Sequence, residues 1–116
     1  DRPYVMVGIM GVAAETDAEA QRLFTSSQQQ FVNLRRNVRK PFPKPVETME
    51  GIWNEVEQYG VEHTLRYAVV GAPATAKSRL KSFLELTGAD ELIISMPIHS
   101  VEARLRSTEI FAELRE

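Results

Sequence analysis

Two apolar segments without regular alternation constrain this sequence most strongly. Residues 4–12 read YVMVGIMGV, and residues 91–96 read ELIISM. A strand with one face in water alternates apolar and polar residues, whereas a strand covered on both faces is apolar throughout. We therefore expect both segments to be interior strands of a parallel α/β sheet.

Helical patterns lie between and after the two expected strands. The predicted helices cover residues 17–39, 74–87 and 100–115. Thr16 and Glu19 form a capping box at the start of the first helix. Pro73 and Gly88 bound the second helix, and Ser100 caps the third. Because β and α segments alternate, the strands should run parallel and be joined by helical crossovers.

Residues 40–66 interrupt this alternation. Three prolines at alternating positions favour an extended backbone, which we interpret as a stiff connector, with an SH3-type ligand as the alternative. A short helix or an irregular excursion follows and contains Trp53 and His63. Residues 67–71, YAVVG, form a weaker extended segment before the next helix. At 116 residues, the chain is long enough for one domain and too short for two.

Two strands buried on both faces do not make a complete sheet. Each would leave an unpaired edge, which solitary domains avoid. The missing strands must come from another copy of the chain or from the rest of a larger α/β protein. We therefore expect the isolated chain to form a homodimer or a higher oligomer.

Charge and cysteine content exclude several classes of protein. A net charge of -2 and a pI near 5.8 give no general attraction to nucleic acid or to anionic membranes. The sequence contains no apolar stretch long enough to span a bilayer and no signal-peptide pattern. The absence of cysteine excludes thiolate catalysis and fits a cytoplasmic protein. His63 and His99 have no third ligand at metal spacing, so no metal site is predicted.

The sequence from Val69 to Leu114 resembles the C-terminal end of bacterial luciferase-like, flavin-dependent monooxygenases. The matching motifs are Val70-Gly71-x-Pro73, Thr87-Gly88-Ala89-Asp90-Glu91, the apolar strand after it, and Arg104-Leu105-x-Ser107. Val101 departs from the pattern, because the family often has a histidine there. Residues 3–36 and the EQYGV at 57–61 extend the resemblance over essentially the whole chain.

This resemblance implies a (β/α)8 TIM-type barrel, a fold of about 250 residues. Residues 4–12 would be strand seven and residues 91–96 strand eight, so the chain would be a C-terminal fragment holding the last quarter of the barrel. The resemblance also implies an enzyme that uses reduced FMN and O2 to oxidise a small organic substrate, and the fragment alone should be inactive. The alternatives are a deazaflavin-dependent oxidoreductase of the same superfamily and a non-catalytic, oligomerising α/β interaction module.

The candidate cofactor-binding residues follow from the barrel, in which ligands bind at the carboxyl ends of the strands. Met10 and Gly11 lie at that end of the first strand, and Ser95 and Met96 at that end of the second. The alternative is structural, with Gly8 and Gly11 relieving crowding and Met96 in the core.

Gly71 is the fifth candidate cofactor-binding residue, at the start of a helix. Free backbone N–H groups there, together with Lys77, could hold a phosphate. An ordinary helix cap is the alternative. No catalytic residue can be assigned from the sequence.

Overall fold

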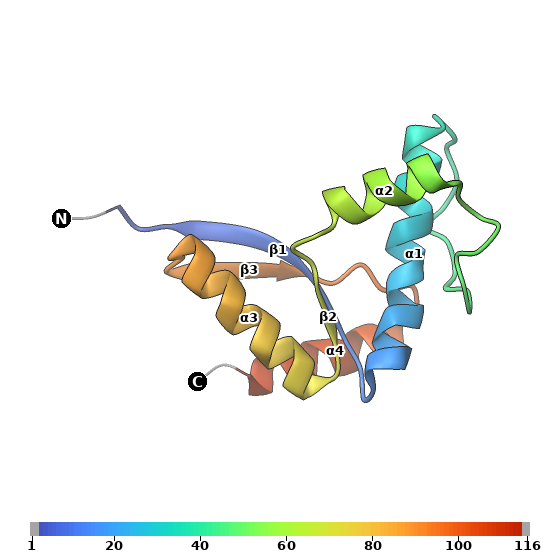
Figure 1. Cartoon of the computed structure of the whole chain (residues 1–116). Helices are drawn as coiled ribbons and strands as arrows, with labels where there is room; N and C mark the ends of the chain where they lie inside the picture. Colours follow the sequence, from blue (N-terminus) through green and yellow to red (C-terminus); the bar gives the residue numbers. More distant parts are fainter. Residues whose placement is uncertain (1–2, 115–116) are drawn as a thin grey trace.

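The computed structural model describes residues 3–114, in which three parallel strands are combined with four helices (Figure 1). The elements in chain order are β1 (Met6–Ala13), α1 (Asp17–Arg35), α2 (Glu55–Thr64), β2 (Val69–Gly71), α3 (Pro73–Thr87), β3 (Glu91–Ser95) and α4 (Val101–Glu113). The strand order is β2-β1-β3, and both pairs are parallel. The predicted α/β class is confirmed.

The helix boundaries differ from the prediction mainly after α1. The helix predicted over 17–39 ends at Arg35, because Asn37 adopts a left-handed backbone with φ of 58° and terminates it. Within 40–66, α2 begins at a full capping box between Asn54 and Glu57. The predicted end of the last helix, at 115, lies outside the described residues.

The weak extended segment is a true strand and changes the role of the two others. β2 pairs with the carboxyl half of β1, with Val12 opposite Val70. β1 is therefore the central strand, and β3 lies at an edge. The expectation that β3 is an interior strand covered on both faces is wrong for the described residues: its exposure alternates, and Ile93 is 55% exposed.

One face of the sheet is covered by α3 and α4. Its core contains Ile9, Ala13, Val69, Ala76, Ile110 and Phe111, all buried, with Ile94 and Phe83 packed against them. In Figure 1, α3 runs along the sheet and α4 lies below it. Since parallel strands are joined by helical crossovers, this layer is the arrangement expected for a β-α unit.

α1 packs at the carboxyl ends of β1 and β2, and α2 leads into the start of β2 (Figure 1). Leu23 and Phe24 of α1 pack with Val12, Val70 and Ile98. A separate small cluster of Val32, Met49 and Val61 joins α1 to α2 and to the chain between them.

The proline-rich segment lies against α1 rather than projecting into solvent. The Gln29 side chain donates a hydrogen bond to the Lys44 carbonyl at 2.8 Å, and the Val46 N–H donates to Thr25 Oγ1 at 2.9 Å. These bonds are consistent with a stiff connector.

Ion pairs connect the end of α1 to α2, and α4 to the turn between β1 and α1. The Arg36 guanidinium donates two hydrogen bonds to the Glu57 carboxylate, at 2.6 and 2.7 Å. This contact and the N–H of Asn54 lower the pKa of Glu57 to about 2. On the other side, Arg106 of α4 pairs with Glu15 in the β1–α1 turn. Over residues 3–114, none of the helices has the length and apolar character to cross a membrane.

Candidate functional site

The carboxyl ends of the three strands meet at one edge of the sheet. Met10 of β1 is the register partner of Ser95 of β3, and Ala13 of β1 is the partner of Gly71 of β2. Four of the five predicted site residues therefore lie on neighbouring strands within a few residues of this edge, and Met96 follows directly. Ligands of parallel α/β proteins commonly bind at this end.

Met10 and Ser95 share the face of the sheet that the helices α3 and α4 leave open. Side chains alternate along a strand, so Gly8 lies on the same face as Met10, and its register partner Ile93 lies beside them. A Cβ placed on Gly8 would meet no atom within 4 Å. Nothing in the described residues crowds Gly8, so a neighbour that requires glycine here would have to come from the rest of the parent. The result is an open, mostly apolar surface.

Gly11 lies on the opposite, covered face. A Cβ there would come within 2.7 Å of Phe111 Cζ and 2.8 Å of Ile94 Cγ2. Gly11 thus allows α4 to approach β1 closely, as the structural alternative for this residue expects.

Met96 is partly buried and packs against the clusters on both sides of the sheet end. The Thr108 hydroxyl lies 3.6 Å from its sulfur and donates to it. The geometry thus assigns packing roles to Gly11 and Met96. Met10 lies on the open face but packs in part against the α1 cluster, and Ser95 is exposed there.

Gly71 lies at the start of α3, where the chain's own carboxylate occupies the helix end. Asp17 Oδ1 accepts a hydrogen bond from the Ala72 N–H at 2.8 Å. This bond, followed by one from the Thr75 hydroxyl, lowers the pKa of Asp17. A Cβ on Gly71 would lie 2.6 Å from Thr75 Cγ2 and 3.0 Å from Asp17 Oδ1.

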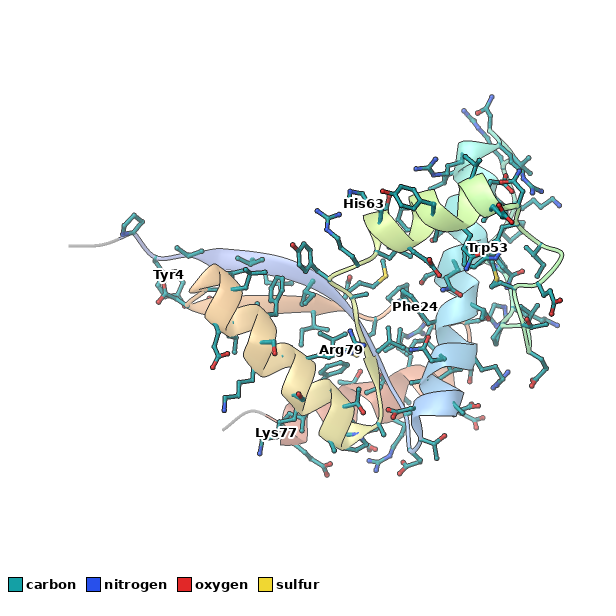
Figure 2. All side chains as sticks on the ribbon, viewed as in Figure 1. Tyr4, Phe24, Trp53, His63, Lys77 and Arg79 are labelled. Carbon is teal, nitrogen blue, oxygen red and sulfur yellow. The ribbon has the colours of Figure 1, made fainter. Side chains whose placement is uncertain are left out.

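A phosphate at this helix start would therefore have to displace Asp17. Lys77 lies elsewhere, in a groove with Leu80, Leu84 and Leu114. Figure 2 shows Lys77 on the outer side of α3, whereas Arg79 lies on the side toward β2. At the helix start where the sequence suggested a phosphate seat, the described residues place the Asp17 carboxylate.

Three serines that sequence analysis did not propose as site residues are fully buried near the strand ends. Ser107 Oγ accepts a hydrogen bond from the Ala13 N–H at 2.9 Å, which anchors α4 to the end of β1. Ser27 Oγ contacts the Pro97 carbonyl at 3.5 Å. Ser26 Oγ has no hydrogen-bond partner within the described residues. Ser107 belongs to the Arg104-Leu105-x-Ser107 motif, so that motif has a structural function here.

The two histidines lie apart from this edge or on the surface. His63 stacks on Tyr59 of α2, with ring centroids 6.2 Å apart, and His99 is exposed in the loop after β3. In the part of the chain from residue 3 to 114, no three His, Asp or Glu side chains are grouped as metal ligands would be.

A large groove follows the free edge of β3. It has a volume of about 640 Å³ and includes Met96, Leu92, Ile94 and Phe111, with Asp90 and Glu91 at one end. The Asp90 carboxylate accepts a hydrogen bond from the Val5 N–H at 2.8 Å, so this end holds the start of β1 in place. The groove thus combines an unpaired strand edge with an apolar floor.

Comparisons with known proteins bear on this arrangement. No family model matches the chain. A luciferase-like monooxygenase of Escherichia coli (strain K12) is 40% identical over 116 residues, which are 100% of this chain and 35% of that protein. The uncharacterized protein YvbT of Bacillus subtilis (strain 168) is 38% identical over 114 residues, 98% of this chain and 34% of its own length.

A solved structure also matches this chain over about a third of its own length. The crystal structure of apo-MsnO8 superposes with a TM-score of 0.82 at 27% identity, over 97% of this chain and 34% of that chain. The chain spans about a third of the length of the curated relatives it matches. The resemblance to luciferase-like monooxygenases that the sequence motifs indicated is confirmed.

Proposed function

Because the chain is similar along its whole length to a luciferase-like monooxygenase, we propose that it forms the C-terminal part of a flavin-dependent enzyme of this kind. The parent would oxidise a small organic substrate with O2 and reduced FMN, in the cytoplasm. The observation that carries the proposal is the open face at the carboxyl ends of β1 and β3, where Met10 and Ser95 lie side by side.

The open face also supports a barrel as the architecture of the parent. The sheet β2-β1-β3 has a free edge at each side, and α3 and α4 cover one face only. In a TIM-type barrel, helices cover the outside and the strands' other face points inward. β1 and β3 would then be strands seven and eight, and Gly8, Met10, Ile93 and Ser95 would face the barrel interior.

The described residues fit the ring of a flavin better than its phosphate. Gly8 leaves room above β1, and the flanking side chains of Met10 and Ile93 offer an apolar surface. The start of α3 is already occupied by Asp17, so the phosphate contacts should lie on the parent's other strands. Of the five candidates, Met10 and Ser95 remain the proposed cofactor contacts.

A flavin supplies the redox chemistry, and the protein binds, orients and shields it. In this proposal Met10 and Ile93 exclude water from one side of the ring. The Ser95 hydroxyl can donate or accept a hydrogen bond at its edge. Ser107 acts indirectly, because its bond to the Ala13 N–H sets the position of the carboxyl end of β1. Since most of the barrel would be supplied by the parent, we expect the 116-residue chain alone to be inactive.

A chimaera tests the function. Residues 1–116 replace the matching third of the Escherichia coli relative, and FMN binding is followed by quenching of flavin fluorescence. The chimaera should bind FMN, Gly8→Trp should abolish binding by filling the open face, and Val101→Trp on exposed α4 should leave it unchanged. A folded chimaera that does not bind FMN, or equal binding by Gly8→Trp, would overturn the proposal. A deazaflavin tested in parallel decides between the two cofactor classes.

A second function is favoured by the same exposed surface. Met6 and Ile93 on the open face are 53% and 55% exposed, and the groove along β3 leaves a strand edge unpaired. Such surfaces associate readily. We propose that the isolated chain forms a homodimer or higher oligomer through them. In sedimentation velocity, Ile93→Asp should produce a monomer and Val101→Asp should not. A wild-type chain that stays monomeric at 100 times the concentration used for the two variants would exclude this association.

A further inference from the structure

A smaller groove, away from the open face, combines two arginines with an apolar floor. It has a volume of about 260 Å³ and lies between the chain just before β2 and one face of α3. Its lining includes Arg66, Tyr67 and Val69 on one side, and Arg79, Phe83 and two serines of α3 on the other. The α3 residues recur at helical spacing, so they form a continuous wall. Val69 and Phe83 belong to the core on the helix-covered side of the sheet, so the groove is on the far side from the proposed flavin surface.

The charges in the groove are all of one sign. Arg66 and Arg79 are its charged side chains, and no carboxylate lines it. Arg66 donates a hydrogen bond to the His63 carbonyl at 2.6 Å, and its guanidinium lies 4.8 Å from the centre of the Tyr67 ring. Neither arginine forms an ion pair with any residue between 3 and 114. Arg66 and Arg79 thus bring two guanidinium groups to one groove, and Arg79 also lies near enough to Asp17 to help lower the pKa of that carboxyl.

The apolar part of the groove is aromatic. The Tyr67 and Phe83 rings lie 6.0 Å apart between centroids and are tilted by 56°. They would pack against the body of a bound molecule, while the serine hydroxyls of α3 add polar contacts beside the arginines. A volume of about 260 Å³ is at the small end for ligand pockets, which span roughly 300–1,000 Å³. It suits one ring with one charged group and is too small for a flavin nucleotide.

We propose that this groove binds a small aromatic oxyanion, a carboxylate or a phosphomonoester. Guanidinium groups recognise both kinds of anion through paired hydrogen bonds. The ring would pack on Tyr67 and Phe83, and the anionic group would lie between Arg66 and Arg79. The site is independent of the flavin surface, because it uses no residue of the open face.

Binding is tested on the 116-residue chain with phenyl phosphate, benzoate and phenol, each titrated by calorimetry and by amide chemical-shift mapping. At least one of the two anions should saturate, with shifts centred on residues 66–69 and 78–86. Phenol, which lacks the charge, should bind at least tenfold more weakly. The affinities for phenyl phosphate and benzoate, compared with each other, show which oxyanion is preferred.

Single substitutions of cations inside and outside the groove test whether binding depends on Arg66 and Arg79. Arg66→Ala and Arg79→Ala should each weaken binding of the preferred anion about tenfold, the effect of losing one charged hydrogen bond. Arg79→Lys should keep part of the affinity, because it keeps the charge and loses the paired geometry. Lys77→Ala removes a cation from the same helix outside the groove and should change nothing. All three side chains are exposed, so the four variants should fold, which circular dichroism checks.

Three results would overturn the proposal. One is a failure of both anions to saturate at millimolar concentration. A second is an equal loss of binding in Lys77→Ala and Arg79→Ala, which would indicate attraction by the general charge of α3 or its start. Equal binding of phenol would likewise reduce the groove to an apolar surface and exclude an oxyanion site.

Discussion

The two faces of the sheet differ in what covers them, although the same strands build both. On the covered face, Gly11 has no room for even one carbon atom beside Phe111. On the open face, Gly8, three residues earlier in the same strand, has open space above it. Gly11 is therefore explained by packing within this chain. Gly8 is not, and neither is the exposure of Met6 and Ile93.

This difference bears on why β1 is apolar along its whole length. A sheet with one face in water should carry polar residues on that face. Here the part of that face that α1 does not cover still carries Met6 and Ile93, beside the half-buried Met10. In our account, the interior of a barrel and its flavin cover this face in the parent protein.

The largest difference should appear between two isoleucines. Ile110 is fully buried under the covered face, and Ile93 is 55% exposed on the open one. Ile110→Ala should lower the free energy of unfolding by about 2–5 kcal/mol, because it removes buried methyl groups and leaves a cavity. Ile93→Ala should change it by less than about 0.5 kcal/mol. Urea denaturation measures both, and similar losses would mean that the open face is packed.

The two glycines give the next comparison. Gly11→Ala should cost about 1–3 kcal/mol, because the added methyl group overlaps the Phe111 ring and Ile94. Gly8→Ala should be neutral or stabilising by about 0.5 kcal/mol, since it restricts the unfolded chain and meets nothing in the fold. A Gly8→Ala variant that unfolds as easily as Gly11→Ala would contradict the assignment of the faces.

A buried and an exposed serine should also differ in how much they stabilise the fold. Ser107→Ala leaves the buried Ala13 N–H without its acceptor and should cost about 1–2 kcal/mol. Ser95→Ala, on the open face, should have almost no effect on stability. For FMN affinity in the chimaera we expect the opposite order. Ser95→Ala should weaken FMN binding more than Ser107→Ala, because only Ser95 is proposed to reach the cofactor. Thermal unfolding and FMN titration of the same two variants check both statements.

The smallest effect should be a pH dependence that belongs to neither face. Arg36 holds the pKa of Glu57 near 2, below its ordinary value of 4.5. A lowered pKa means that the pairing stabilises the folded chain above about pH 4.5, and that this contribution is lost as the pH falls toward 2. Glu57→Gln should therefore flatten the decrease in Tm between pH 5 and 2. An unchanged profile would show that other carboxylates control acid unfolding.

Local signals in the sequence predicted much of this fold. Ser100 caps α4 by accepting from the Ala103 N–H, and Gly88 ends α3 with φ of 64°, both as expected. Thr16 caps α1, but Glu19 pairs with Arg22 instead of completing the capping box. Caps depend on residues three or four positions apart, so a single sequence contains them.

Contacts between distant segments could not be predicted. Asp17 and Ala72 are 55 residues apart, and Ala13 and Ser107 are 94 apart. No local sequence pattern predicts either bond. The sequence therefore could not show that Asp17 occupies the helix start at Gly71, where a phosphate was predicted. β2 is only three residues long and gives a weak signal. The two glycines of β1 also look alike in sequence, because the fold alone decides which face the helices cover.

Cysteine labelling tests whether the open face contacts a flavin in the parent enzyme. This chain has no cysteine of its own, so Ile93→Cys and Val101→Cys can each be introduced singly into a chimaera whose other cysteines are replaced. Saturating FMN should slow the reaction of a thiol reagent at position 93 at least tenfold and leave position 101 unchanged. FMN that binds fully without slowing labelling at position 93 would contradict the account.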